Sequence, residues 1–451
     1  MIVRTRIAPS PTGHPHIGTI YQALFNYAFA KKHNGSFIVR IEDTDKTREV
    51  SDSEKVIFSS LDFFSLKEDE SPRKGGKFGP YRQSERLWFY HKYAQELISK
   101  GYAEFSYFPK EQSKGKKDYS LANQSEKVVT KKSNDMPTTI EEMISKKDWV
   151  VRLKVPKDEK IIVHDQLRGD IEFDSNQISS QVLIKSDGFP TYHLAVVVDD
   201  HLMQVSHIVR AEEWISSFPK HHLLYKYLNW KMPPTYHTAT LRNPDKSKLS
   251  KREGHTDVNW YINEGFLPDA ILNYLALLGW SHPSEQEIFT LDEFIKLFDL
   301  KDIRPIASVF DTQKLKWLNS KYIQKLSISE LTKKLTSFYP AAIKLPQLEE
   351  IIKLAQSRME TLKDFEVLTK HFLSFENELS SNELKKTLRS DFEKEKDWNK
   401  NNIFAVMKKN MQRYNIKMNV LYKLLTGSEK GLPLPESLEI LGKEETLNRL
   451  S

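Results

Sequence analysis

The fold is decided by residues 1–45, MIVRTRIAPSPTGHPHIGTIYQALFNYAFAKKHNGSFIVRIEDTD. Residues 2–7 are predicted to form a strand, and residues 37–41 a second apolar strand that ends in Glu42-Asp43-Thr44-Asp45. Between them, apolar side chains recur at the spacing of one helix face. These are Tyr21, Leu24, Phe25, Ala28 and Phe29. Asn34-Gly35 then favours the left-handed backbone that ends a helix. Strand, helix and strand in this order predict a right-handed βαβ unit within a parallel sheet.

The loop between the first strand and the helix is a predicted ligand site. In a βαβ unit the ligand binds beyond the carboxyl end of the strand, against the helix N-terminus. His16-Ile17-Gly18-Thr19 occupies that position. Unpaired amide groups and the helix dipole predict phosphate binding there. Gly18 would permit a close approach, and His16 can donate to a phosphate in a transition state. An ordinary polar crossover loop with two surface histidines is the alternative that these residues leave open.

Length and composition indicate a multidomain globular protein. The 451 residues allow roughly two to four domains, and 39% hydrophobic with 29% charged residues is typical of a soluble folded chain. No apolar run is long enough to span a bilayer, and the first strand begins without a signal peptide. The lack of cysteine excludes disulfides and thiolate metal sites and fits a cytoplasmic location. A net charge of +7 permits a polyanionic partner without requiring one.

Beyond the βαβ unit, a strand-rich block interrupts the α/β pattern. Residues 75–84 form a glycine-rich turn that leads into a helix, and residues 110–147 have the polar composition of a surface insertion. Strand patterns then follow at residues 150–156, 161–164 and 169–173. We therefore expect a small inserted domain over residues 82–185.

The α/β pattern resumes after this block and gives way to helices. The apolar runs 194–198 and 205–209 are typical of buried parallel strands. Each run ends in charged residues, which we expect at the same sheet edge as His16. From Val258 onward the pattern is helical, without an internal repeat of fixed period.

The basic loop Lys248-Leu249-Ser250-Lys251-Arg252 is the second candidate site. Lys248 and Lys251 can stabilise negative charge on a triphosphate while its α-phosphorus is attacked. Such a step needs positioning and electrostatics more than covalent catalysis. Alone, two lysines at this spacing indicate a basic surface loop more often than a phosphate site. Together with His16 and Gly18, on the first crossover, they favour a phosphate site.

These two motifs resemble the ATP-site motifs of class I aminoacyl-tRNA synthetases. The first spans Pro9–Thr19 and the second Lys248–Arg252. The surrounding segments resemble the bacterial-type glutamyl-tRNA synthetases more narrowly. They are Arg6–Gly13, Ile41–Asp45, Gly79–Ser84, Lys185–Ala195, Arg210–Trp214, Leu241–Asp245, Leu278–Trp280 and Phe310–Leu315. The resemblance covers residues 1–325 strongly and the helical remainder more weakly.

The resemblance implies a fold of three parts. It implies an α/β Rossmann-like class I synthetase catalytic domain with an inserted α+β acceptor-binding domain, followed by an all-α C-terminal anticodon-binding domain. The implied boundaries are 1–81 and 186–240 for the catalytic halves, 82–185 for the insertion, 241–322 for a stem-contact domain with the KLSKR loop, and 323–451 for the anticodon-binding helices.

The resemblance also implies the reaction and its residues. Glutamate would be adenylated by ATP with Mg²⁺ and transferred to the 3′ end of tRNA. The implied glutamate site consists of Arg6, Ala8, Ser10, Glu42, Tyr192, Val196 and Arg210. The implied ATP site consists of His16, Gly18, Thr19, Glu213, Leu241, Lys248, Ser250, Lys251 and Arg252, with His16, Lys248 and Lys251 catalytic. Arg358 is the implied anticodon contact, against the alternative of a solvated arginine.

Within the implied glutamate site, the charged residues have distinct roles. Arg6 and Arg210 would hold carboxylates, because a guanidinium fork matches a carboxylate better than an ammonium does. Glu42 would accept the α-ammonium group. For Arg6 and Glu42, a salt bridge at the edge of the sheet is the alternative.

Three positions depart from the family pattern. Many relatives bind zinc through cysteines in the insertion, and residues 102–107 offer none, so we expect no structural zinc and no protein metal site. Val196 stands where some relatives carry Asn against the substrate, so that contact would be lost or made by the backbone alone. Phe218 replaces a more usual Thr, without a consequence that the sequence reveals.

Three other functions compete with a glutamate–tRNA ligase. They are a shorter relative that glutamylates a modified tRNA base, a simple nucleotidyltransferase and a catalytically silent tRNA-binding protein. The helical tail argues against the first, the pair Arg6 and Arg210 against the second, and the presence of His16 and Lys251 against the third. The expected partners are tRNA(Glu), L-glutamate and ATP, with tRNA(Gln) left open. We expect a monomer without membrane association.

Overall fold

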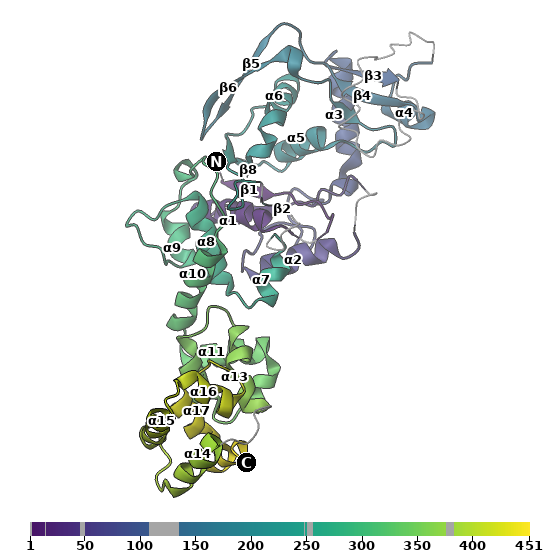
Figure 1. Ribbon diagram of the computed structural model, residues 1–451. Helices are drawn as coiled ribbons and strands as arrows, with labels where there is room; N and C mark the ends of the chain where they lie inside the picture. Colours follow the sequence, from purple (N-terminus) through teal and green to yellow (C-terminus); the bar gives the residue numbers. More distant parts are fainter. Residues whose placement is uncertain are drawn as a thin grey trace. The chain divides into compact units, whose positions relative to one another are not determined.

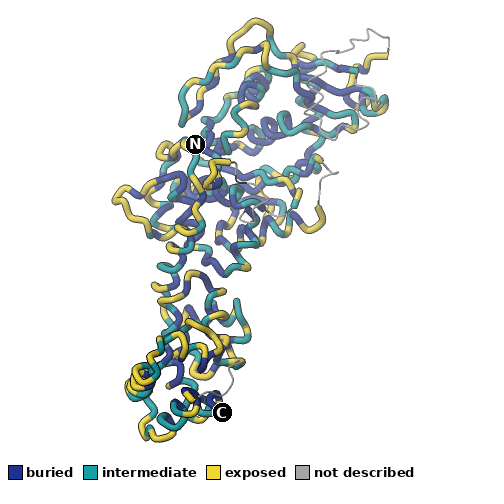
Figure 2. Tube along the Cα trace, viewed as in Figure 1, coloured by how far each residue is buried: buried dark blue, intermediate teal, exposed yellow. Residues whose placement is uncertain are grey.

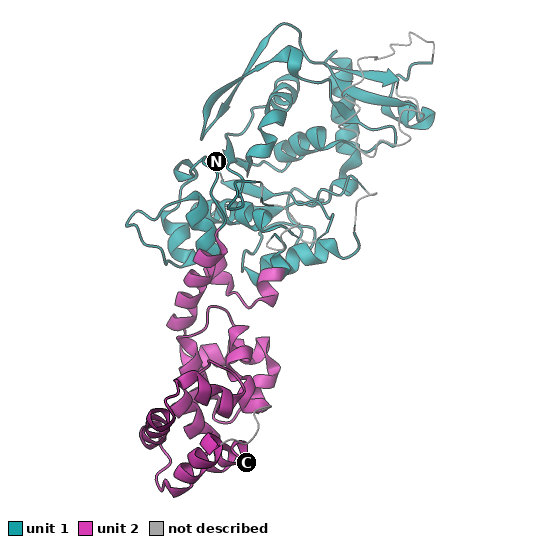
Figure 3. Ribbon diagram, in the orientation of Figure 1, with its two compact units in different colours: residues 1–259, 272–310 teal, residues 260–271, 311–451 magenta. Residues whose placement is uncertain are grey.

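The computed structural model describes residues 2–13, 15–45, 50–107, 135–247, 249, 256–375 and 383–451. The chain divides into two compact units (Figure 3). Unit 1 contains residues 1–259 and 272–310, and unit 2 contains residues 260–271 and 311–451. Among the described residues, no helix combines the length and apolar character needed to cross a membrane.

The predicted βαβ unit is present at the start of unit 1 (Figure 1). It consists of β1 (Arg4–Ile7), α1 (Ile17–Lys32) and β2 (Ser36–Val39). The two strands pair in parallel from Arg4 opposite Ser36 to Ile7 opposite Val39. The five apolar side chains predicted on one face of α1 are all buried. Asn34 has a φ of 51°, as the helix-ending signal requires. The prediction for this segment is confirmed.

A four-stranded sheet continues beside β1. Its order is β6-β5-β9-β8, and its strands are β6 (Gly169–Asp174), β5 (Lys160–Asp165), β9 (Thr235–Thr238) and β8 (Ile208–Ala211). β8 and β9 are parallel, whereas β5 and β6 form an antiparallel hairpin. The amide of Ser206 donates to the Arg4 carbonyl at 2.9 Å, and Arg6 Nη1 donates to the Val209 carbonyl at 3.3 Å. β8 therefore runs alongside β1, and their carboxyl ends lie at one edge.

A separate three-stranded antiparallel sheet has the order β3-β4-β7. It consists of β3 (Ala103–Tyr107), β4 (Trp149–Leu153) and β7 (Val182–Ile184). The strands predicted at 150–156, 161–164 and 169–173 all exist, but only the first belongs to this sheet. The other two are β5 and β6 of the four-stranded sheet. The strand-rich block thus contributes to two sheets.

The strand predicted at residues 194–198 is wrong. These residues lie inside helix α5 (Tyr192–Leu202), and all five are buried. A helix that is surrounded by protein has the same continuous apolar run as a buried strand, and periodicity alone does not distinguish the two. The run at 205–209 is partly right, because β8 begins at Ile208.

The other helices of unit 1 cover these sheets. They are α2 (Ser53–Phe63), α3 (Leu87–Ser99), α4 (Ile140–Lys146), α6 (Phe218–Tyr227) and α9 (Leu291–Leu297). Helices α7 (Val258–Asn263) and α8 (Pro268–Gly279) contain residues of both units. A Cβ atom at Gly279 would lie 2.4 Å from the Tyr21 hydroxyl, so this glycine permits the end of α8 to approach α1 closely.

Unit 2 is helical throughout its described residues beyond 311. Its helices are α10 (Thr312–Lys325), α11 (Ile328–Phe338), α12 (Leu348–Gln356), α13 (Asp364–Leu373), α14 (Glu383–Lys394), α15 (Lys400–Tyr414), α16 (Met418–Thr426), α17 (Leu434–Leu441) and α18 (Lys443–Arg449). Most of these helices bury apolar side chains, and buried and exposed residues alternate along the trace (Figure 2). The predicted change from α/β to helical structure is confirmed.

Candidate functional site

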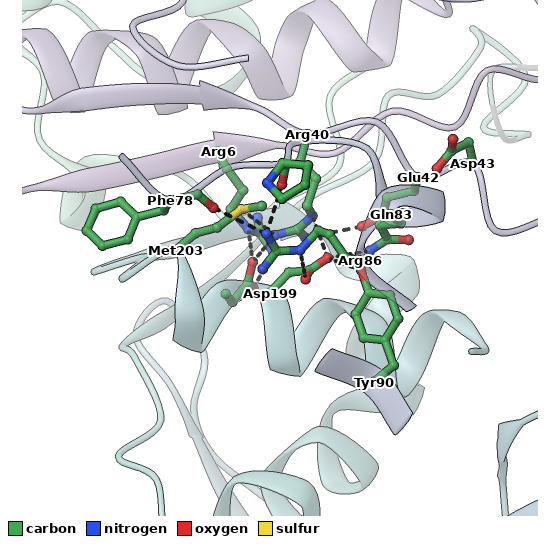
Figure 4. A network of polar contacts seen from close by, with 12 residues as sticks. Arg6, Arg40, Glu42, Asp43, Phe78, Gln83, Arg86, Tyr90, Asp199 and Met203 are labelled. Carbon is green, nitrogen blue, oxygen red and sulfur yellow. Dashed lines mark hydrogen bonds and ion pairs between the residues drawn. The ribbon is translucent and has the colours of Figure 1, made fainter. Parts of the chain in front are cut away.

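A buried network of charged side chains lies where β1 and β2 end against α5 (Figure 4). Arg6 donates to both carboxylate oxygens of Asp200, from Nε and from Nη2, at 3.0 Å each. Arg40 is completely buried and donates to Asp200 at 2.8 Å and to Glu42 at 3.2 Å. Buried charges are tolerated when they are paired and hydrogen-bonded in this way. The salt bridges that were the alternative for Arg6 and Glu42 are therefore present.

The neighbouring Asp199 accepts the remaining hydrogen bonds of the network. Its carboxylate accepts hydrogen bonds from Arg86 at 2.7 Å and from Gln83 and Tyr90 at 2.9 Å each. Arg40 also lies 3.7 Å from it. The segment after β2 and the start of α3 are thereby fastened to α5. This network fixes the backbone on which Arg6 and Glu42 are carried.

Glu42 is the carboxyl group of this network with the most perturbed protonation. Its side chain is 8% exposed. Burial raises its pKa to about 7, against the opposing effects of Arg40 and Arg6. Asp200, by contrast, has a lowered pKa because Arg6 and Arg40 outweigh its burial. A positive group bound beside Glu42 would compensate its charge.

Arg210, at the end of β8, is buried without a carboxylate partner. Its Nε donates to Nε2 of His237, and its Nη1 to Nδ1 of His221, at 2.9 Å each. Its Nη2 is buried and has no acceptor among the residues that the structure describes. Burial lowers the pKa of this guanidinium, although an arginine remains charged at any ordinary pH.

The two imidazoles beside Arg210 have defined tautomers. His237 donates from Nδ1 to Asp165 at 2.7 Å, so its Nε2 is the acceptor that faces Arg210. His221 accepts from Arg210 on Nδ1, so its Nε2 carries the proton and donates to His193 at 3.1 Å. Burial and nearby positive charge lower the pKa of His221 and bring the pKa of His193 to about 3. The rings of His221 and His193 are therefore neutral at physiological pH.

Tyr192 and Val196 lie one turn apart on α5, and Tyr192 contacts this cluster, because its ring centroid lies 5.7 Å from that of His221. The Tyr192 ring stacks on Trp214 with centroids 4.1 Å apart. Burial raises the pKa of Tyr192, and the charges that act on it are those of Arg210, Glu42, Arg6 and Asp200. The glutamate-site residues implied by the sequence resemblance are therefore brought together. Val196 is buried.

Ala8 and Ser10 follow β1 directly and lie next to the segment after β2. The amide of Glu42 donates to the Pro9 carbonyl at 3.1 Å, between these two residues. Ala8 is half-buried, and Ser10 is exposed. Both therefore border the cluster at the carboxyl edge of the sheet.

At the start of α1, the structure differs from the prediction of unpaired amide groups. The amide of Ile17 donates to the Thr256 carbonyl at 2.7 Å, and that of Thr19 to the His16 carbonyl at 2.7 Å. The Gly18 amide donates to Nδ1 of His16 at 2.9 Å, so His16 caps the helix. The prediction is wrong for these three amides, because the chain supplies its own acceptors.

The chain that follows the second motif nevertheless contacts the first motif. Thr256, just after the KLSKR loop, bonds to Ile17, and the Val258 amide donates to the Pro15 carbonyl at 3.2 Å. At the other end, the buried Leu249 donates to the Leu241 carbonyl at 3.2 Å. The predicted site residues Lys248, Ser250, Lys251 and Arg252 lie outside the described residues.

The remaining predicted residues lie at the periphery. Glu213 is exposed in the turn after β8. Its neighbour Glu212 accepts from the amide and hydroxyl of Thr240 at 3.0 and 2.9 Å, which holds the segment before Leu241. Arg358 is exposed just after α12 in unit 2. Among the described residues, no group of three or more His, Asp and Glu side chains is arranged to hold a metal ion.

Comparison with known proteins identifies the family. Residues 2–317 match the family described as tRNA synthetases class I (E and Q), catalytic domain, and residues 330–451 match the anticodon binding domain. A glutamate–tRNA ligase of Marinobacter nauticus is 40% identical over 472 residues, which cover 100% of this chain and 94% of the relative. One of Thermus thermophilus is 41% identical over 468 residues, covering 100% and 99%. The chain belongs to the class I glutamate–tRNA ligases.

Solved structures agree with this assignment. The crystal structure of a glutamate tRNA ligase from Elizabethkingia meningosepticum in complex with its amino acid superposes with a TM-score of 0.82. It is 32% identical and covers 100% of this chain and 98% of that one. The fold predicted from the resemblance is confirmed, and the match over residues 330–451 removes the shorter relative and the simple nucleotidyltransferase as alternatives.

Sequence reasoning assigned no contacts to the residues that hold the candidate site in place, although it placed Asp199 and Asp200 at the sheet edge as charged residues. The residues that hold the site are Arg40, Arg86, Asp165, Asp199, Asp200, His193, His221, His237 and Trp214. One signal was available, since Asp199-Asp200 directly follows an apolar run that is otherwise free of charge. The histidines carry no such signal.

Proposed function

We propose that this chain activates L-glutamate with ATP, accompanied by Mg²⁺, and transfers it to tRNA. In the first step a glutamate carboxylate oxygen attacks the α-phosphorus of ATP, forming glutamyl adenylate and releasing pyrophosphate. In the second step a ribose hydroxyl at the 3′ end of the tRNA attacks the activated carbonyl, forming an ester and releasing AMP. Both steps depend on positioning and on stabilisation of developing charge.

We propose that the cluster around Arg210 and Glu42 binds glutamate. The observation that carries this assignment is a pair of incompletely matched charges, since the Glu42 carboxylate is held, among the described residues, only by Arg40 at 3.2 Å. Arg210 is a buried cation without a carboxylate partner, and Glu42 is a buried carboxyl with a raised pKa. A substrate with carboxylate and ammonium groups supplies both missing partners. Arg6, whose charge is paired with Asp200, adds a hydrogen-bond donor next to them, because its Nη1 has two N–H groups and bonds to one acceptor among the described residues, the Val209 carbonyl.

The other glutamate contacts in this proposal come from the rim of the cluster. The Tyr192 hydroxyl donates to a substrate carboxylate, while the Ala8 backbone and Ser10 complete the pocket. Val196 offers only apolar contact, because its side chain has no hydrogen-bonding group.

For ATP, we propose the binding residues His16, Gly18, Thr19, Glu213, Leu241, Lys248, Ser250, Lys251 and Arg252. The contacts of Thr256 with Ile17 and of Val258 with Pro15 support this set, because they hold residues 256–258, which follow the KLSKR motif in the sequence, against the start of α1. Since three amides of α1 already have acceptors, we assign the phosphate charge to Lys248 and Lys251, with His16 as a further donor.

For tRNA, we propose tRNA(Glu) as the substrate, with tRNA(Gln) as a second candidate, and Arg358 as a contact to the anticodon. Its exposure after α12 leaves the guanidinium accessible to an unstacked base. We further propose a cytoplasmic monomer that contains no structural zinc, because the chain lacks cysteine. Light scattering and metal analysis of the purified protein test the last two points.

The deciding experiment is aminoacylation with ¹⁴C-glutamate on separately transcribed tRNA(Glu) and tRNA(Gln). Label on tRNA(Glu) alone makes the enzyme discriminating, and label on both makes it a producer of glutamyl-tRNA(Gln). Label on neither, also with natively modified tRNA, would contradict the proposal and favour a silent tRNA-binding protein. For the site, Arg210→Gln should raise the KM for glutamate roughly 10- to 100-fold, the effect of losing a hydrogen bond to a charged group.

A further inference from the structure

The partners of Arg210 differ from those of the other buried arginines nearby. Arg4 pairs with Glu70, Arg6 with Asp200, and Arg86 with Asp199, at 2.6 to 3.0 Å. Arg210 instead donates to two imidazole rings. An imidazole nitrogen satisfies an N–H donor without neutralising its charge. The positive charge of Arg210 is therefore kept, although the side chain is buried.

We propose that His221 and His237 are positioning residues that keep the charge of Arg210 available for the substrate carboxylate, and thereby determine the preference for glutamate over its amide, glutamine. The inference rests on the proposed role of Arg210 in binding glutamate. A carboxylate at either histidine position would pair with Arg210 in the free enzyme. The substrate carboxylate would then have to compete with it.

The surrounding contacts fix both rings as neutral acceptors. Asp165, which is completely buried, accepts a hydrogen bond from Nδ1 of His237 at 2.7 Å and another from the His237 amide at 3.0 Å. It is therefore separated from Arg210 by the width of one ring. On the other side, Nδ1 of His193 accepts a hydrogen bond from Nε2 of His221 at 3.1 Å. The ring of Phe218 covers the guanidinium, with its centroid 5.8 Å from Cζ of Arg210.

The unsatisfied nitrogen of Arg210 indicates where a carboxylate would bind. Nε of Arg40 and Nη2 of Arg86 are also buried without an acceptor among the described residues, but both of those side chains already pair with aspartates. Of the three guanidinium nitrogens of Arg210, Nε and Nη1 are occupied by the histidines, whereas Nη2 is buried and makes no well-formed hydrogen bond among the described residues. The Tyr192 side chain also interacts with this guanidinium. A buried donor without a partner is costly. A carboxylate oxygen of the substrate would remove that cost and neutralise the charge, whereas the amide oxygen of glutamine could accept the hydrogen bond but would bring no negative charge.

The test compares isosteric substitutions that differ only in charge. His221→Asn retains a neutral oxygen acceptor near the position of Nδ1, and His221→Asp places a carboxylate there. We expect His221→Asn to keep the KM for glutamate within a few-fold of wild type. We expect His221→Asp to raise it roughly 10- to 100-fold, with a much smaller change in kcat. The ratio of kcat/KM for glutamate over glutamine should fall only in the Asp variant. His237→Gln and His237→Glu form the second matched pair.

Each outcome decides the inference. If the neutral and charged variants have equal KM values and equal selectivity, the histidines are merely structural and the inference is overturned, while the proposed function stands. If Arg210→Gln leaves the KM for glutamate unchanged, the assignment of the pocket and the inference both fail. Should the charged variants not fold, ¹⁵N spectra of wild-type protein labelled at histidine decide. The inference requires neutral rings, protonated on Nε2 in His221 and on Nδ1 in His237, and a cationic ring at neutral pH overturns it.

Discussion

Replacing Glu42 by Gln should stabilise the free protein at neutral and alkaline pH while it weakens substrate binding. Burial raises the pKa of this carboxyl from 4.5 to about 7. Between these two values the folded state binds more protons than the unfolded state, so the free energy of unfolding falls as the pH rises. A difference of about 2.5 pH units at 1.36 kcal/mol each corresponds to about 3 kcal/mol. Because the Gln side chain carries no charge, the free energy of unfolding of the variant does not fall in this way as the pH rises.

Urea denaturation of both proteins at pH 5 and pH 8 measures the effect. At pH 8 we expect Glu42→Gln to exceed wild type by up to about 3 kcal/mol, and at pH 5 by far less. Asp43→Asn is the control, because Asp43 is the adjacent buried carboxyl and holds Ser84. If the free energies of unfolding of wild type and Glu42→Gln depend on pH in the same way, Glu42 does not titrate in this window.

Pyrophosphate exchange in the presence of tRNA measures how Glu42→Gln changes the KM for glutamate. An ammonium group binds the ionised form of Glu42, so the KM of wild type for glutamate should fall as the pH rises from 6 to 8. The histidines near Arg210 do not contribute to this change, because the pKa values of His193, His221 and His237 are all lowered. In Glu42→Gln the KM should be roughly 10- to 100-fold higher and independent of pH over this range. An unchanged KM would remove Glu42 from the ammonium site.

Three further predictions concern other parts of the site. Lys251→Ala should lower the rate of adenylate formation by roughly two orders of magnitude, as loss of a transition-state contact does, and a nearly unchanged single-turnover rate would exclude Lys251 from the mechanism. Asp199→Asn should destabilise the protein by about 3–5 kcal/mol, because it leaves buried Arg86 and Arg40 partly unpaired; a melting temperature equal to that of wild type would contradict this. Val196→Asn should lower the KM for glutamate several-fold if an added polar contact reaches the substrate, and a KM that stays the same or rises would place this position outside the pocket.

The sequence predicts the βαβ unit correctly because its signals are local. The apolar positions on α1 have helical spacing, and the turn at Asn34 has the residue type that a left-handed backbone favours. The same kind of reasoning gives the wrong prediction for residues 194–198. Their five consecutive apolar side chains are all buried, and whether they lie in a strand or a helix depends on neighbours that are distant in the chain.

The candidate site is predictable to a lesser degree. The resemblance names Arg6, Glu42, Tyr192 and Arg210, and the structure brings these four together. It does not name their partners, because each pairing joins distant segments. Arg6 and Asp200, for example, are 194 residues apart. A pattern within one segment cannot show which buried arginine receives a carboxylate and which receives an imidazole.

In the proposed assignment, the pairing of Arg210 with imidazoles instead of carboxylates determines which amino acid the cluster prefers. Asp199 and Asp200 are fully engaged by Arg6, Arg40 and Arg86, so these aspartates do not compete for Arg210. An aspartate beside Arg210 would instead neutralise its charge in the free protein, and a substrate carboxylate would have to compete with it. Because the acceptors at Arg210 are neutral rings, a buried positive charge faces the pocket while Glu42 retains a partly uncompensated negative one. Selectivity for an acidic amino acid thus depends on which charges the protein leaves unpaired, as much as on which groups touch the substrate.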